Sequence, residues 1–530
     1  MGNYFGLKSR HFERILPLAA PPLSALALVS GYPHYNLYLL PWVGLAPLFL
    51  ALSGRSARAR ALISYFFGVF FFGLLFYWFC HARSPAWVGY LIFVIVIPVI
   101  FIPWGLAAGW ALDWNSPAAF FAPALGWTAL ELLMSRGTFA FPWWSLAVSQ
   151  AKNTAVLQIA SITGMYGISF LVVSCNLVFF KTLTGQGARH RIPFLVTGAL
   201  FALAVGYGAY SLWKREPLRR QPMRIAMTQP SFAQDEKHEA IEGGIIASLD
   251  EMQRVFWSMA MTASKHDPQP DVIVWPETAL PVQWLLREDM SPRPETAMLL
   301  DMADATLISG VFIGNYNSVI GIAPDGRYLG RYDKMQLVPG GEFIPWRREL
   351  SRVPALGNWF DRAVYQDDTE RGTRYHIFET AHGRVGPLIC FESMAPHIAR
   401  GMTRRGAEML LVVTNDAWFK YSPAAAQHVA LAQLRAVENR RWLAQASNSG
   451  LTVIIDPRGR IAASSGLFER QNIHGALYPR TDTTFYTKYG DVFAWACAGL
   501  FAALLLGLYA AEKLNLGMET NPCGDAEPRR

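Results

Sequence analysis

Long apolar segments dominate the first 213 residues of the chain, and one more lies near the C-terminus. They fall at about 15–31, 37–53, 61–80, 88–110, 117–134, 154–180, 193–213 and 491–511. About 20 consecutive apolar residues can cross a bilayer as a helix. A secretory signal peptide has one such run followed by ordinary soluble sequence, which is not the pattern here. The sequence therefore predicts a polytopic α-helical membrane domain with about eight transmembrane helices. The first two segments are short enough to be tilted or partly embedded.

Composition supports this interpretation and excludes several other classes. Of the 530 residues, 52% are hydrophobic and only 16% are charged, yet the formal net charge is +8. The five cysteines show no pairing pattern, and the sequence contains no metal-binding cluster of Cys and His, no Gly-rich phosphate loop and no nucleic-acid motif. We therefore attribute the excess of Lys and Arg to membrane topology and anionic lipid, and we expect no metal, no cofactor and no nucleic acid.

The positions of Lys and Arg between the apolar segments predict the orientation, because positive residues resist translocation. With a cytoplasmic N-terminus, the inside segments hold Lys8, Arg10, Arg14, Arg55, Arg58, Arg60, Lys181, Arg189 and Arg191. The outside loops then hold only Arg83, Arg136 and Lys152. Seven crossings place the region after residue 213 outside, and the last helix returns the C-terminus to the cytoplasm. A miscount by one helix would invert that region.

Strands and helices alternate in the polar part of the chain, which is typical of an α/β domain. A charged, Pro-containing linker at 214–222 precedes this domain, which we place at 223–485, and a tail at 512–530 follows the last apolar segment. Predicted strands lie at 224–228, 271–275, 307–313 and 409–413, with helices at 239–266, 297–305 and 424–445. Hairpins are predicted at 318–332, 374–389 and 451–462.

Three blocks of this domain carry residues suited to covalent chemistry. Glu277, Lys334 and Cys390 each follow a segment predicted to be a strand, and Glu342 stands shortly after Lys334. An isolated Cys in apolar surroundings is most often an inert core thiol. A base and a cation in the same domain change that interpretation, because the thiolate is the nucleophilic form of cysteine. Cys390 is therefore a candidate nucleophile.

Together the blocks Trp-Pro-Glu-Thr, Tyr-Asp-Lys and Ile-Cys-Phe-Glu resemble the nitrilase, or carbon-nitrogen hydrolase, superfamily with its Glu-Lys-Cys triad. The later block Thr-Asn-Asp-Ala-Trp-Phe fits the same pattern. The resemblance implies an αββα sandwich, which the alternation alone does not specify. In the chemistry that it implies, Cys390 attacks, Glu277 is the general base, and the charged Lys334 stabilises both the thiolate and the oxyanion.

Supporting residues follow from the same resemblance. The backbone N–H of Phe391 is expected to be a second oxyanion donor. Glu342 and Glu392 are expected to orient Lys334 or an attacking amine, the alternative for each being a solvated surface carboxylate, and Glu342 is the stronger candidate. We do not expect His397, predicted on the exterior of a helix, or His428 to be catalytic.

Other polar and aromatic residues have two interpretations. Arg435 and Glu438 are spaced i, i+3 and are typical of an ion pair on a helix surface. The loops at 281–290 and 344–360 combine apolar residues with catalytic neighbours, so they either pack on the sheet or form lids that touch the bilayer. The candidate substrate or lid residues are Trp284, Phe343, Trp346 and Trp418.

Over essentially its whole length, the chain resembles the apolipoprotein N-acyltransferase family, the membrane branch of the nitrilase superfamily. The resemblance rests on seven predicted helices before the catalytic domain, one after it, and the quoted blocks, with Val-Pro-x-Gly-Glu among them. It implies a monomer in the bacterial inner membrane with a periplasmic catalytic domain. Cys390 would take an sn-1 acyl chain from a phospholipid as a thioester and pass it to the α-amine of an apolipoprotein's diacylglyceryl-cysteine.

Other function classes remain to be weighed. The main alternative is a membrane-anchored amidase of the nitrilase type, which would use water where the transferase uses an amine, but a soluble substrate would need one anchor at most. A scaffold with an inactive site is disfavoured by the intact triad. A transporter is disfavoured because the apolar segments contain few ionisable residues, of which Glu131 is the clearest.

Overall fold

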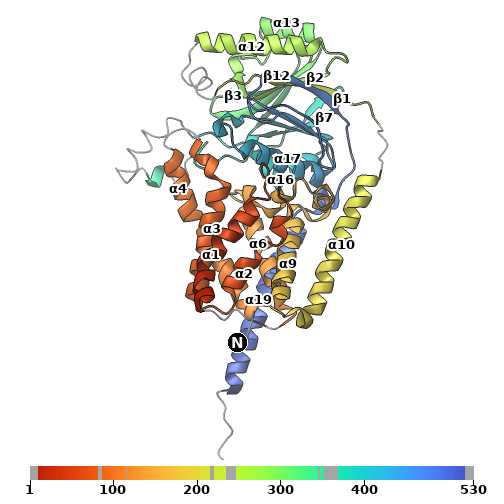
Figure 1. Ribbon diagram of the computed structural model, residues 1–530. Helices are drawn as coiled ribbons and strands as arrows, with labels where there is room; N and C mark the ends of the chain where they lie inside the picture. The colour runs from red at the N-terminus through yellow and green to blue at the C-terminus, as the bar shows by residue number, and fades with distance from the viewer. Residues whose placement is uncertain are drawn as a thin grey trace, which may run out of the picture.

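The computed structural model describes residues 10–81, 86–114, 116–214, 220–233, 246–343, 347–350, 352 and 368–519. Figure 1 shows a bundle of helices with a layered, strand-containing part at one end. The bundle comes from the first 213 residues and the C-terminal helix, and the layered part comes from the region between them. The predicted fold class, a helical membrane domain with an α/β domain, is confirmed.

The longer helices of the bundle are α1 (Arg10–Val29), α2 (Ala46–Leu52), α3 (Ala57–Leu75), α4 (Ala86–Val96), α5 (Phe101–Asp113), α6 (Ala122–Met134), α9 (Met165–Leu183), α10 (Arg191–Trp213) and α19 (Val492–Glu519). Among the described residues, five helical stretches are long and apolar enough to cross a membrane: Ala57–Leu75, Gly89–Asp113, Met165–Leu183, Gly187–Trp213 and Val492–Lys513. The other predicted segments correspond to shorter apolar helices, including Arg14–Val29, Leu40–Leu52 and Ala119–Met134.

The segment predicted at 154–180 is interrupted rather than continuous. Two short helices, α7 (Thr154–Leu157) and α8 (Ala160–Thr163), precede α9, and Gly164 separates them from it with a φ of +65°. A Cβ at this position would lie 2.6 Å from the ring of Tyr486. Both the left-handed backbone and the close ring therefore require glycine, and the helix can restart only at α9.

Two six-stranded sheets form the layered part. The first has the order β12-β1-β2-β3-β4-β5 and the second the order β11-β10-β9-β8-β7-β6. The first sheet contains β1 (Met223–Gln229), β2 (Val272–Pro281), β3 (Thr306–Ile313), β4 (Tyr316–Ile322), β5 (Tyr328–Asp333) and β12 (Gln471–Leu477). The second contains β6 (Phe378–Thr380), β7 (Gly383–Ile389), β8 (Met409–Thr414), β9 (Leu443–Ser447), β10 (Val453–Ile455) and β11 (Ile461–Ser464).

The central strands of each sheet are parallel, and the two sheets face each other. Strands β1, β2 and β3 run parallel, as do β7, β8 and β9. Strand β2 contacts both β8 and β9, and one buried cluster joins Met227 and Val274 of the first sheet to Leu411 and Val413 of the second. Apolar side chains from both sheets therefore form the core between them.

Helices cover the outer faces of the sandwich, as an αββα arrangement requires. The helices α12 (Ile246–Ser264) and α13 (Pro294–Ala303) pack on the first sheet, and α16 (Pro396–Arg404) and α17 (Ala424–Asn439) pack on the second. The helix predicted at 424–445 is too long: Arg440, with a φ of +51°, ends α17, and residues 443–447 form β9. Pairing of this segment with β8 and β10 outweighs its helix propensity.

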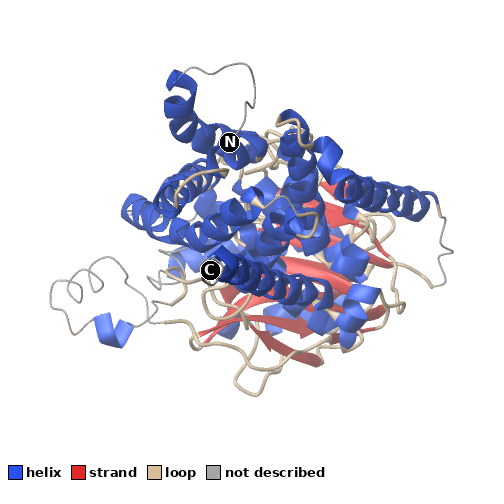
Figure 2. Cartoon of the chain, turned by 90° about the horizontal axis from the view of Figure 1, so that it is seen from below, coloured by secondary structure: helices blue, strands red, loops and turns tan. Residues whose placement is uncertain are grey.

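Helix α17 lies between the sandwich and the bundle, so that both of its faces are buried. Val429 and Ala432 belong to the core of the sandwich, whereas Leu431 and Leu434 belong to the core of the bundle. In Figure 2, which views the chain from below, the helices of the bundle lie in front of the strands. The two parts therefore share α17 as a common wall.

The Arg435–Glu438 pair was predicted on a helix surface, and this is wrong, because α17 has no free surface here. Both side chains are fully buried, with Arg435 Nη2 2.7 Å from Glu438 Oε1. Arg435 also donates to the carbonyl of Met394, and Glu438 accepts from the backbone N–H of Met165 at the start of α9. Burial raises the pKa of Glu438 to about 7, against the effect of Arg435. The pair thus joins the catalytic part to the bundle.

Arg435→Met should lower the melting temperature of the detergent-solubilised protein, because it leaves the Glu438 carboxylate buried without its cation. Breaking such a pair costs about 3–5 kcal/mol. Adding Glu438→Gln to Arg435→Met removes the stranded charge and should recover part of the loss, which differential scanning fluorimetry can measure. A double variant that melts at or below Arg435→Met would contradict this account.

Candidate active site

A buried ammonium group lies at the centre of the candidate site. Lys334 directly follows β5 and is only 1% exposed, and its Nζ lies 3.2 Å from Glu277 Oε1 and 2.7 Å from Glu342 Oε1. Glu277 reaches this point because the register between β2 and β3 shifts after Trp275. The sequence-predicted base, cation and first supporting carboxylate are therefore in direct contact.

The charge of Lys334 is set by its neighbours. Burial lowers the pKa of the ammonium, but Glu342, Glu277 and Cys390 raise it more, so that its pKa lies above the ordinary value. Lys334 therefore remains a cation at neutral pH. A fixed positive charge out of contact with water is the group that a developing thiolate or oxyanion needs.

Asn317 belongs to the same cluster, and the sequence analysis missed it. This residue of β4 is buried, and its Nδ2 donates to Glu277 Oε1 at 2.7 Å and to Glu342 Oε1 at 3.1 Å. One amide therefore holds both carboxylates beside Lys334. A polar Asn immediately before the predicted hairpin at 318–332 was the signal that could have identified it.

Cys390 directly follows β7, which ends at Ile389, as the predicted strand before it requires. Its backbone is left-handed, with a φ of +48°. Burial, Glu277 and Asp416 raise the pKa of its thiol, whereas Lys334 and a hydrogen bond with Thr414 lower it, and the pKa lies well above the ordinary value. The resting group is therefore a neutral thiol, which a base must deprotonate before it can attack.

Glu392 organises the backbone around the site rather than the ammonium itself. Its Oε1 accepts from the Tyr332 hydroxyl at 2.7 Å and from the N–H groups of Met335 and Gln336 at 2.6 and 3.1 Å. Its Oε2 accepts from the N–H of Ile389 at 2.9 Å. Burial raises the pKa of Glu392 to about 7 despite these bonds. The carboxylate thus ties the loop after Lys334 to the strand that ends at Cys390.

The two histidines differ in their surroundings. His397 of α16 is half-buried, and its pKa is lowered to about 4 by burial and by Arg136. His428 of α17 is fully buried, and its Nε2 lies 3.2 Å from the carbonyl oxygen of Cys390. The contact reaches the backbone of the nucleophile.

The four candidate lid residues do not form one group. Trp284 is half-buried and packs on the apolar cluster between the first sheet and α12. Leu285 and Leu286 of the same loop are buried members of that cluster. This loop therefore follows the packing alternative. Phe343, the residue after Glu342, and Trp418 are half-buried. Trp346 lies outside the described residues.

Aromatic side chains from the bundle pack against Phe391, the residue after Cys390, and against the segment after β8. The ring of Phe391 stacks on Phe141, with centroids 5.9 Å apart. Trp143 donates to Gln427 of α17 at 2.9 Å and packs against Phe419. Among the described residues, no group of three or more His, Cys, Asp or Glu side chains is placed to hold a metal ion. The arrangement suits covalent catalysis by a thiol at an apolar boundary.

Glu392→Gln should lower the melting temperature. The amide nitrogen of Gln is a donor, so one backbone N–H that donates to the carboxylate in the wild type would lose its acceptor. A buried donor left without an acceptor costs about 1–3 kcal/mol. Glu379→Gln, on the exposed edge strand β6 of the second sheet, is the matched control and should melt like the wild type. Equal melting temperatures for both variants would show that Glu392 does not hold this backbone.

Comparison with known proteins adds independent evidence. Residues 239–481 match the carbon-nitrogen hydrolase family model, and residues 24–178 match the model of the apolipoprotein N-acyltransferase N-terminal domain. Saccharomyces cerevisiae Nit3, a nitrilase-superfamily structure, is 18% identical with a TM-score of 0.36, over 50% of this chain and 93% of that chain.

Two curated relatives match nearly end to end. The apolipoprotein N-acyltransferase of Geobacter metallireducens is 30% identical over 91% of this chain and 94% of its own length. That of Pseudomonas syringae pv. tomato is 30% identical over 93% and 96%. On this evidence, the chain belongs to the apolipoprotein N-acyltransferase family.

Proposed function

We propose that this acyltransferase moves an acyl chain from the sn-1 position of a phospholipid to the α-amine of the diacylglyceryl-cysteine of an apolipoprotein, through a thioester on Cys390. Family membership supports N-acylation of an apolipoprotein. The observation that carries the chemistry is the buried Lys334 ammonium, which contacts Glu277 and Glu342 and acts electrostatically on Cys390.

In the first half-reaction, Glu277 accepts the proton of the Cys390 thiol, and the thiolate attacks the ester carbonyl carbon of the donor. A C–S bond forms, and the Lys334 ammonium and the Phe391 N–H stabilise the oxyanion. The ester C–O bond then breaks, and Glu277 returns its proton to the departing glycerol oxygen. The products are an acyl thioester and a lysophospholipid.

In the second half-reaction, the neutral α-amine of the acceptor attacks the thioester carbonyl. Glu277 accepts a proton from the amine as the C–N bond forms, and the same two donors stabilise the oxyanion. The C–S bond breaks, and the departing thiolate of Cys390 takes the proton from Glu277. The enzyme returns to its starting state, and the cycle requires no cofactor.

The surroundings of the site support transfer to an amine over hydrolysis. Phe141 of the bundle stacks on Phe391, and Trp143 packs against Phe419 beside it. Apolar walls of this kind keep water away from a reactive thioester. An amidase would instead need water at this position, so the transferase is the better interpretation.

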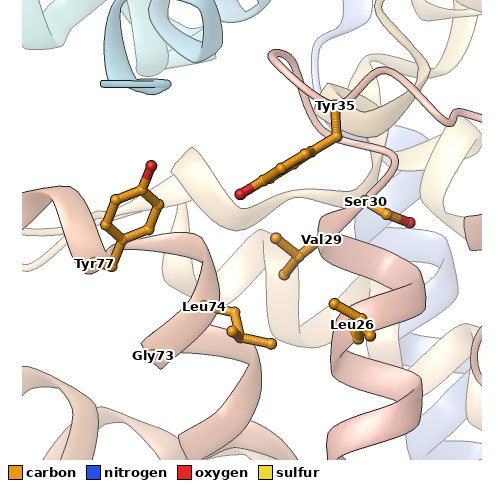
Figure 3. A pocket seen from close by; sticks show the side chains of 7 residues that line it. All are labelled: Leu26, Val29, Ser30, Tyr35, Gly73, Leu74 and Tyr77. Carbon is orange, nitrogen blue, oxygen red and sulfur yellow. The ribbon is translucent and has the colours of Figure 1, made fainter. Parts of the chain in front are cut away.

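A cavity in the bundle supports a lipid substrate. It has a volume of about 230 Å³ and lies between α1 and α3, where aliphatic side chains such as Leu26 and Leu74 line it (Figure 3). The rings of Tyr35 and Tyr77 also line it. Trp78, the residue after Tyr77, packs against Phe419, which also contacts Trp143. An apolar lining suits an acyl chain better than a small polar amide.

The proposed domain plan follows the sequence analysis. Residues 1–213 form the membrane domain, 214–222 the linker, 223–485 a periplasmic catalytic domain, 491–511 the last membrane helix, and 512–530 a cytoplasmic tail. Both termini would then lie in the cytoplasm, which the distribution of Lys and Arg supports. We propose that the enzyme acts as a monomer, because the triad comes from a single chain.

A phospholipid labelled in its sn-1 chain tests the proposal. We expect mass spectrometry to find a hydroxylamine-labile acyl adduct on Cys390, which disappears when a diacylglyceryl-peptide is added and its amine becomes acylated. Cys390→Ser cannot form this thioester, whereas Cys175→Ser, a matched change in the bundle, should retain it. Label released only as free fatty acid would identify a hydrolase instead.

Asn317→Ala should lower the kcat of acyl transfer, because Glu277 and Glu342 lose the donor that holds both of them beside Lys334. A hydrogen bond to a charged group is worth about 2 kcal/mol, or roughly 30-fold in rate. Asn315→Ala, at an exposed position in the turn between β3 and β4, is the control and should keep wild-type kcat. An unchanged kcat in Asn317→Ala would contradict this role.

A further inference from the structure

A second charged pair, Asp416 and His428, contacts the backbone of Cys390. His428 Nδ1 is 3.0 Å from Asp416 Oδ1, and neither side chain is exposed. His428 Nε2 lies 2.7 Å from the Ser393 hydroxyl and 3.2 Å from the carbonyl oxygen of Cys390. The mechanism above uses neither member of this pair.

The two ring nitrogens of His428 both face groups that accept hydrogen bonds. Nδ1 meets the carboxylate of Asp416, and Nε2 meets the backbone carbonyl of Cys390, which can only accept. A neutral imidazole has one N–H and could satisfy only one of these oxygens. Donation to both oxygens therefore takes an imidazolium, whereas an imidazole protonated only on Nδ1 would accept from the Ser393 hydroxyl through Nε2. The direction of the pKa agrees with the imidazolium, because burial lowers the pKa of His428 but Asp416 raises it more, to above the ordinary value.

The same aspartate also reaches the thiol side of Cys390. The Thr414 hydroxyl lies 3.1 Å from Asp416 Oδ1, and the Thr414 side chain forms a hydrogen bond with the Cys390 thiol. Contacts from the Asp416 carboxylate thus reach Cys390 by two routes. One leads through His428 to the backbone carbonyl of Cys390, and the other leads through Thr414 to its thiol. These groups come from β8, the segment after it, and α17.

Cys390 needs such support because of its backbone conformation. Its φ of +48° lies in the left-handed region, which residues with a Cβ seldom occupy. The chain therefore leaves the extended conformation of β7 at Cys390. Such strained residues persist where surrounding contacts determine them, and they cluster at active sites.

We propose that Asp416 and His428 form a positioning unit for Cys390: the His428 N–H holds the Cys390 carbonyl, and with it the left-handed backbone that directs the thiol toward Glu277 and Lys334. The inference rests on the proposed role of Cys390 as the nucleophile. His428 is not the base in this scheme, because its contact is with the carbonyl of Cys390, and Glu277 takes the proton.

Two substitutions at His428 separate this role from simple packing. The amide nitrogen of Gln can take the place of Nε2, so His428→Gln keeps the donor to Cys390 but loses the charge. The amide nitrogen of Asn matches Nδ1, so His428→Asn keeps the contact with Asp416 but loses the contact with Cys390. His397→Asn, on the neighbouring α16, is the matched control.

The first readout is the rate at which iodoacetamide alkylates Cys390 in the full-length protein, which requires no lipid substrate. The second is the single-turnover rate of thioester formation. We expect His428→Asn to slow both by about 100-fold, the typical effect of displacing a reacting group by about 1 Å. His428→Gln should stay within about 5-fold of wild type, since it keeps the donor. His397→Asn should match wild type, and KM for the donor should change little in all variants.

The outcomes separate the two proposals. Equal losses in His428→Gln and His428→Asn, or no loss in either, would overturn the positioning role. If His428→Asn fails to fold, His428→Leu carries the test: it fills the space without a donor for the Cys390 carbonyl, and its loss should match that expected for His428→Asn. Wild-type protein whose Cys390 is alkylated normally but never acylated would refute the proposed function, while the alkylation rates would still decide the positioning role.

Discussion

The Lys334 ammonium is the interaction on which the site depends. Removing a charge from water costs several kcal/mol, so a buried cation persists only where anions and hydrogen bonds compensate for that cost. Here the compensation comes from Glu277 of β2 and from Glu342 after β5, with Asn317 of β4 bonded to both. Because three strands of one sheet supply these groups, the sandwich must form before the ammonium can be buried.

The bundle supplies the other wall of the site, and a carboxylate within it fixes that wall. Glu131 accepts hydrogen bonds from Trp127, Ser169 and Ser145, and from the N–H of Leu146. The last two residues belong to the segment that carries Phe141 and Trp143 to the nucleophile. An ionisable residue in a membrane helix can mark a transport path. In this protein, its partners show that it anchors an aromatic cover.

The candidate groups could be selected from the sequence because each stands after an apolar run, and the structure places Lys334 and Cys390 directly after strands and Glu277 within β2. Partners that depend on the packing of distant elements could not be predicted. Asn317 faces the site only because its strand pairs between β3 and β5. Arg435 was predicted at a surface because the spacing of charges along α17 does not reveal that a bundle covers the helix. The end of α17 was missed for a similar reason, since pairing with β8 and β10 converts residues 443–447 into a strand.

The charges of the site also bear on the proposed role of Cys390, whose thiol resists ionisation. Burial and the charges of Glu277 and Asp416 disfavour an anion at Cys390 and raise the pKa of its thiol, against the effect of Lys334. Transfer of the proton from Cys390 to Glu277 moves the negative charge without adding to it. The ammonium keeps one carboxylate and gains a thiolate, and the net charge of the buried cluster is unchanged. No water is needed to solvate the change, which is the property that an enzyme with a hydrolysable thioester at a membrane surface requires.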